Sequence, residues 1–146
     1  MEAKQYLENI RFMMNEKAMW EDELGKIDDM IIGAPAIQYD SDKITSSPRK
    51  DGLEMLAINH LERREDIIRQ INNLITELIE KRDEALRYIT LIKSKDQQEV
   101  LIMYYVNALS WREIADIRDR YNLAGQMRLR DRAISTLQKI FDDMAI

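Results

Sequence analysis

The chain has 146 residues, of which 45% are hydrophobic and 34% are charged, and its formal net charge is −5. It contains no Cys, which excludes disulfide bonds, zinc fingers and a thiol nucleophile and fits a reducing cytoplasm, where we expect the protein to act. With 4 Gly and 2 Pro it has few helix breakers, so we expect an all-α fold with long helices. No apolar run approaches the roughly 18 residues of a membrane span, and the polar N-terminus does not resemble a signal peptide, so no membrane partner is expected.

The first predicted helix runs from about residue 2 to residue 31. Its apolar residues recur at alternating steps of four and three, interrupted once by Lys17, a spacing typical of a helix that packs along one seam. These residues are Tyr6, Ile10, Met13, Trp20, Leu24, Ile27 and Ile31. Both prolines and a cluster of Ser, Asp and Gly follow, and neither the helical nor the strand period continues. We therefore predict a loop over about 32–52, which is long for a compact domain.

The helical spacing returns from residue 53 to about residue 93. At 1.5 Å per residue such a helix is about 60 Å long, so it must pack against another helix to bury its apolar side. The apolar residues that set the spacing include Ala57, Leu61, Ile68, Ile71, Ile75, Leu78, Ala85, Ile89 and Ile92. Residues 1–93 are therefore predicted to form a long antiparallel helical hairpin of the coiled-coil type. Ile67, Leu74 and Ile79 widen the apolar stripe, which favours a homodimer through the long helices.

Residues 94–146 are predicted to form a small unit of three helices. Ser94 with Gln97, and Ser110 with Glu113, each have the spacing of a capping box that opens a helix. The last helix has one apolar face, formed by Leu129, Ala133, Ile134, Leu137, Ile140 and Phe141. Two short capped helices followed by a longer one indicate a helix-turn-helix.

Basic residues are concentrated in this C-terminal unit. Residues 112–139 contain 7 Lys and Arg against 4 Asp and Glu, whereas residues 1–95 contain 15 against 19. Guanidinium groups at the start of a recognition helix can pair with guanine edges or with phosphates. The candidate DNA-binding residues are Arg112, Gln126, Arg128, Arg130 and Arg132. The alternative interpretation of these arginines, which have Asp131 among them, is a solvated helix face.

Residues 97–140 resemble the promoter-recognition domain of sigma factors, known as region four. The resemblance rests on Trp111, Ile114 and Ala115, followed by a turn and a helix that contains Arg132, Ala133, Ile134 and Leu137. The layout of the whole chain is similar to the ArpU/RinA-like transcriptional regulators encoded by phages of Gram-positive bacteria. The resemblance implies that residues 94–146 bind double-stranded DNA with the last helix in the major groove, and it makes RNA polymerase a further candidate partner.

The same resemblance adds Asn122 to the candidate DNA-binding residues, because it corresponds to the polar turn residue of the family. The sequence departs from the family pattern at the first buried position of the last helix. The family prefers Val at that position, whereas here the register places Gln126 there, or Met127 if the helix starts later.

Enzyme chemistry is not expected from this sequence. No nucleophile–base pair, glycine-rich phosphate loop or nucleotide motif is present. His60 is the single histidine, and the acidic residues between Glu77 and Glu84 lack the Glu-x-x-His pairs of a di-metal bundle. We therefore expect no metal and no cofactor.

Three functions remain open at this point. The first is a DNA-binding transcriptional regulator, encoded by a phage or prophage of a Gram-positive bacterium. The second is a DNA-packaging or assembly protein similar to a phage small terminase subunit, which also combines a helix-turn-helix with a coiled coil. The third is a helical interaction module that does not bind DNA, an alternative that the net negative charge favours.

Overall fold

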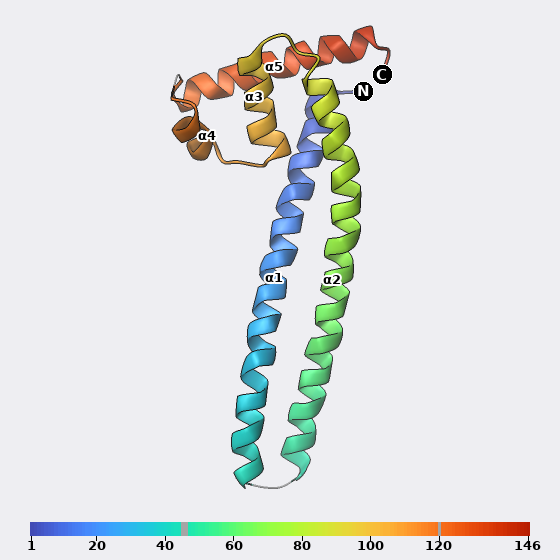
Figure 1. Cartoon of the computed structure of the whole chain (residues 1–146), viewed down its shortest axis with the longest axis vertical. Helices are drawn as coiled ribbons and strands as arrows, with labels where there is room; N and C mark the ends of the chain where they lie inside the picture. Colours follow the sequence, from blue (N-terminus) through green and yellow to red (C-terminus); the bar gives the residue numbers. More distant parts are fainter. Residues whose placement is uncertain (45–46, 120) are drawn as a thin grey trace. The chain divides into compact units, whose positions relative to one another are not determined.

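The computed structural model describes the backbone of residues 1–146 except 45, 46 and 120, and the side chains except those of 32–51, 53 and 120. The described backbone is helical and contains no strand, which confirms the all-α prediction (Figure 1). Among the described residues, no helix combines the length and the hydropathy needed to cross a membrane. The helices are α1 (Ala3–Ile44), α2 (Ser47–Ile89), α3 (Lys95–Leu101), the π-helical η1 (Ile102–Val106), α4 (Trp111–Ile117) and α5 (Leu123–Asp143).

The loop predicted over residues 32–52 is wrong, because α1 continues to Ile44 and α2 already begins at Ser47. Pro48 is the second residue of α2, and in the first turn of a helix the N–H that proline lacks has no partner in any case. The Ser, Asp and Gly residues that suggested a loop each cost a helix about 1 kcal/mol or less relative to Ala, which a long helix tolerates. The rest of the predicted turn, residues 45 and 46, lies outside the described residues.

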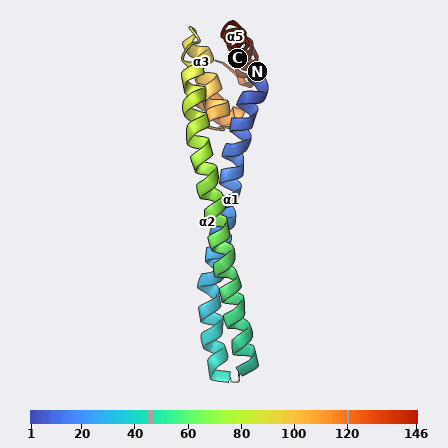
Figure 2. The ribbon, with the colours of Figure 1, turned by 90° about the vertical axis from the view of Figure 1, so that its right-hand side faces the viewer.

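The chain contains two compact units: unit 1 consists of residues 1–16 and 76–146, and unit 2 consists of residues 17–75. In unit 2, α1 and α2 lie side by side in antiparallel directions (Figures 1 and 2). Ile27, Ile67 and Ile71 are buried there, with Trp20, Leu24, Ile31 and Ile75 packed around them. Most residues of the predicted seam in this unit are thus buried or half-buried. Two positions differ: Ile67, which was predicted to lie next to the seam, is buried, and Leu61, which was predicted to be part of it, is 49% exposed.

Unit 1 has a larger core, which joins both ends of the chain. Buried side chains come from the start of α1, the end of α2, and α3, η1 and α5; they include Leu7, Ile10, Ala85, Ile89, Ile92, Leu101, Tyr105, Ala133, Leu137 and Phe141. Three aromatic rings (Tyr6, Tyr88 and Phe141) meet edge to face, with centroids 5.0 to 5.9 Å apart. Each such pair contributes about 0.5–1.5 kcal/mol beyond the area that it buries.

Polar contacts also fasten α1 to the C-terminal helices of unit 1. The Arg11 Nη1 donates to the carbonyl oxygens of Tyr104, at 2.6 Å, and of Leu109, at 3.0 Å. The backbone N–H of Ala3 donates to the Gln138 side-chain oxygen at 2.7 Å, so α5 supplies a partner for an N–H at the start of α1. Because these contacts hold α5 against the rest of unit 1, they determine which side of α5 faces outward.

Candidate nucleic-acid interface

The start of α4 is fixed by two local features of the chain. Ala108 has a φ of 55°, and the N–H of Leu109 donates to the Met103 carbonyl at 2.9 Å, so the chain reverses after η1. Ser110 then caps α4: its Oγ accepts from the N–H of Glu113 at 3.2 Å, and its own N–H donates to the Glu113 Oε1 at 3.3 Å. The predicted capping box at this position is confirmed.

The start of α5 is fixed by Asn122, which is its N-cap. The Asn122 Oδ1 accepts from the backbone N–H of Gly125 at 2.7 Å. Gly125 lies close to Tyr121, and a Cβ at position 125 would stand 3.1 Å from the Tyr121 Cβ. The side-chain oxygen of Asn122, expected to face DNA, therefore stabilises the helix terminus instead.

Gln126 is completely buried, with an exposed fraction of 0%. Its Nε2 donates to the carbonyl oxygens of Arg118, at 3.0 Å, and Tyr121, at 3.4 Å, and its Oε1 accepts from the Arg118 Nε at 3.3 Å. The expectation that Gln126 contacts DNA is wrong, because the amide is inaccessible and its hydrogen bonds are satisfied inside the protein. Gln126 thus occupies a buried position of α5.

Arg118 connects three helices, although no sequence pattern singled it out. It follows α4 directly and is 6% exposed. Its guanidinium forms ion pairs with Asp96, at 2.9 Å, and with Glu99, both on α3, and it also donates to Gln126 of α5. The one available signal was the pair of carboxylates in α3, three residues apart and hence on one face of that helix.

Arg130 is directed toward an aromatic pair. The rings of Tyr104 and Trp111 stack with centroids 4.1 Å apart, and the Arg130 guanidinium carbon lies 5.1 Å from the Trp111 centroid and 5.6 Å from that of Tyr104. Its Nε donates to Asp131 at 2.8 Å, and its side chain is 22% exposed. Cation–π contacts of this kind attach α5 to α4. Arg130 was expected to contact DNA, and the structure instead gives its guanidinium partners within the protein.

Burial also affects the tyrosine next to this aromatic pair. Desolvation raises the pKa of the Tyr105 phenol, and the nearby charge of Arg130 acts in the opposite direction. The neutral phenol is therefore favoured in the folded protein, as expected for a side chain in the core of unit 1.

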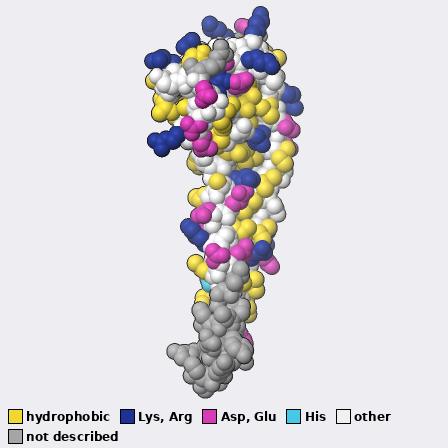
Figure 3. Space-filling view, turned by 60° about the vertical axis from the view of Figure 1, so that its left-hand side comes forward, with side chains coloured by type: hydrophobic (Ala, Val, Ile, Leu, Met, Phe, Trp, Pro, Cys, Tyr) yellow, Lys and Arg dark blue, Asp and Glu magenta, His cyan; other side chains and the backbone are white. Residues whose placement is uncertain are grey.

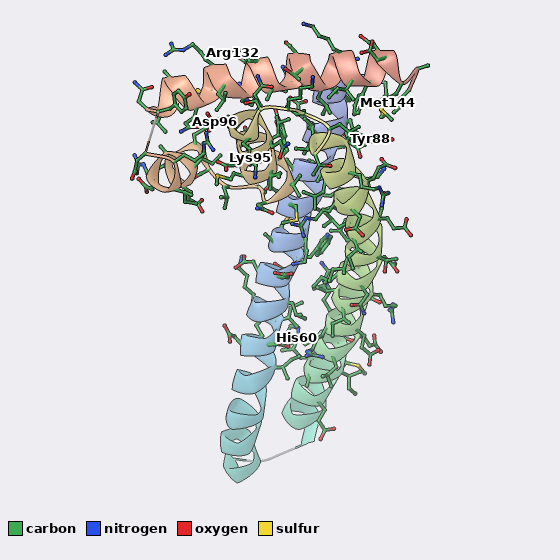
Figure 4. All side chains as sticks on the ribbon, turned by 45° about the horizontal axis from the view of Figure 1, so that its top comes forward. His60, Tyr88, Lys95, Asp96, Arg132 and Met144 are labelled. Carbon is green, nitrogen blue, oxygen red and sulfur yellow. The ribbon has the colours of Figure 1, made fainter. Side chains whose placement is uncertain are left out.

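The remaining predicted arginines are exposed. Arg112 lies in the first turn of α4, and Arg128 and Arg132 lie one turn apart on α5. Arg132, labelled in Figure 4, lies at the surface of α5. At the surface of unit 1, Lys and Arg side chains alternate with Asp and Glu (Figure 3). The outer side of α5 thus presents guanidinium groups to solvent.

A shallow groove of about 420 Å³ continues this surface toward the end of α5. It is lined by Gln97, Asp131, Arg132, Ser135, Thr136 and Lys139. Arg132 and Lys139 are seven residues apart, so two turns of helix bring both cations to the same side. Lys139 was not among the predicted site residues, although this spacing could have indicated it.

These features form a surface that can bind an anionic polymer. The described residues contain no group of three His, Cys, Asp or Glu side chains that could hold a metal ion. The cationic side chains of Arg112, Arg128, Arg132 and Lys139 are exposed, while Asn122, Gln126 and Arg130 make hydrogen bonds or cation–π contacts within the protein. A search of protein-family models finds no match to this chain, and searches of curated proteins and of solved structures find no significant match.

Proposed function

We propose that the chain binds double-stranded DNA with α4 and α5 acting as a sigma-like helix-turn-helix, and that it is a transcriptional regulator. The observation that carries this proposal is the division of α5 into two faces. Leu129, Ala133 and Leu137 are buried in the core of unit 1, whereas Arg128 and Arg132 are exposed. A helix held by its inner face, with arginines outside, has the form required to enter a major groove.

The contacts beneath α5 support this function. A helix that reads DNA must keep its position while its side chains contact bases, and this requires support from neighbouring residues. Asn122 caps α5, Gln126 connects it to Arg118, and Arg130 packs on Trp111. Arg112, exposed in the first turn of α4, then has the position of a phosphate contact beside the groove.

The regulatory role is proposed from the resemblance of residues 97–140 to the sigma-factor domain. A homodimer through α1 and α2, with RNA polymerase as a further partner, belongs to the same proposal. Apolar side chains in unit 2 remain exposed in the single chain, and their exposure supports the dimer; they are Met19, Met30, Ile58 and Leu61. A phage or prophage origin is proposed on the similarity of the chain's layout to the ArpU/RinA-like family.

Salt dependence tests the proposal. We expect the chain to bind a random-sequence duplex, measured by fluorescence anisotropy, with log Kd rising linearly against log salt concentration. Each phosphate contact contributes about 0.9 to the slope, so contacts by Arg112, Arg132 and Lys139 in each protomer give a slope of about 3 per protomer. Absence of salt-sensitive binding contradicts the proposal.

An interaction module that does not bind DNA is the second candidate. Two observations favour it: the net charge is −5, and Asn122, Gln126 and Arg130 are engaged within the protein. This candidate predicts no duplex binding at any salt concentration, so the same titration separates the two functions.

A further inference from the structure

The first two turns of α5 expose apolar side chains. Leu123 is 44% exposed, Met127 is 37% exposed, and Ala124 between them is also exposed. Leu123 and Met127 are four residues apart and therefore neighbours on the helix surface. At about 100° per residue, Ala124, Met127 and Arg128 share the outer side of α5. An apolar surface thus adjoins the exposed guanidinium of Arg128.

The core of unit 1 does not use these side chains. The buried residues in the first two turns of α5 are Gly125, Gln126 and Leu129, which lie on the inner side of the helix. Ala124 and Met127 are therefore left to contact whatever approaches the outer side of the helix. Under the proposed function, that partner is the floor of a major groove.

The major groove offers one apolar group to such a surface. Guanine, cytosine and adenine present hydrogen-bond donors and acceptors there, whereas thymine also presents its 5-methyl group. Apolar side chains next to a phosphate-binding or guanine-binding arginine therefore match thymine better than any other base. The arginine supplies the charge complementarity that brings DNA, rather than an apolar protein, to this surface.

We propose that Ala124 and Met127 read thymine methyl groups, so that the DNA recognised by this chain carries thymines beneath the first two turns of α5. This inference rests on the proposed function and adds the base that the site selects. Arg128, beside the apolar residues, then contacts a guanine edge or a phosphate at the margin of the thymines.

The test replaces thymine by uracil, which differs from it only in lacking the methyl group. Bound sequences are first selected from a random duplex pool, and the enriched duplex is then synthesised with dT or with dU. We expect Kd to rise about fourfold for each methyl group removed from beneath α5. Met127→Ala should weaken binding to the dT duplex and reduce the difference between dT and dU, because the variant no longer contacts one methyl group.

Arg128→Ala is the matched control. It should weaken binding to both duplexes by the same factor, because its contact does not involve a methyl group. Equal Kd for the dT and dU duplexes, or enrichment of no motif from a pool that does bind, overturns the inference and leaves the proposed function standing. No binding to the pool at all overturns the proposed function and this inference together.

Discussion

Arg118 and Gln126 are joined by reciprocal hydrogen bonds in the interior of unit 1. The Arg118 Nε donates to the Gln126 Oε1 at 3.3 Å, and the Gln126 Nε2 donates to the Arg118 carbonyl at 3.0 Å. Asp96 and Glu99 neutralise the guanidinium from α3. The turn between α4 and α5 is therefore held by a polar network, in which each buried group depends on the others.

Gln126→Leu tests this network. The substitution keeps the side-chain volume but removes the partners of a buried guanidinium N–H and a carbonyl oxygen. An unsatisfied buried polar group costs about 1–3 kcal/mol, so we expect the free energy of unfolding to fall by that amount in urea denaturation. Gln70→Leu, at an exposed position of α2, is the control and should leave the midpoint nearly unchanged. A midpoint for Gln126→Leu equal to that of the control would show that the network contributes no stability.

Ala108→Gly should stabilise the protein. Ala108 has a left-handed φ of 55°, which costs an L-residue about 1–2 kcal/mol and costs glycine nothing. Glycine loses more entropy on folding, so the net gain is about 0.5–1 kcal/mol. Thermal denaturation should show a higher Tm for this variant and a lower Tm for Ala18→Gly, at an exposed position within α1. If the Tm of Ala108→Gly also falls, the backbone at residue 108 is not strained.

Alkaline pH should destabilise unit 1 through its buried tyrosines. Desolvation raises the pKa of Tyr6, and its hydrogen bond to Glu84 raises it further; desolvation also raises the pKa of Tyr105. Because the folded-state pKa exceeds the unfolded value, the stabilisation is complete below about pH 10 and is lost as the pH rises above it. Urea denaturation on both sides of that pH should show the fall in stability.

Tyr6→Phe should reduce this alkaline loss, because it removes one of the two raised groups. It should also lower stability at neutral pH, since the hydrogen bond to Glu84 is absent. Tyr121→Phe is a control at an exposed position, where the alkaline loss should match that of the unsubstituted protein. A pH profile of Tyr6→Phe that matches the profile of this control contradicts the assignment.

Features that depend on nearby residues could be predicted from the sequence. The capping box of Ser110 and Glu113 involves four consecutive residues, and the apolar spacing of α5 is local to one helix. The start of α2 could not be predicted, because Pro48 breaks a helix in its interior but not in its first turn. Local sequence patterns therefore predicted which helices form more accurately than the residues at which those helices begin and end.

The roles of individual polar residues required tertiary partners. Gln126 is a residue type that often reads DNA bases. Here it is buried because it bonds to Arg118, eight positions earlier, whose guanidinium is in turn held by the carboxylates of α3. Arg130 packs on aromatic rings from η1 and α4, which sequence spacing alone does not bring together. Arg128 and Arg132 are exposed because they lie on the side of α5 opposite its apolar face.

The exposed arginines of α5 provide the most direct test of DNA binding. The affinity of the Arg128→Ala, Arg132→Ala double variant for a random duplex should be measured at one low salt concentration, with Arg69→Ala of unit 2 as the control. We predict that the double variant binds at least about tenfold more weakly, with unchanged helical circular dichroism, while the control binds as the unsubstituted protein does. Equal affinity of the double variant and the control would contradict the placement of DNA on the outer face of α5.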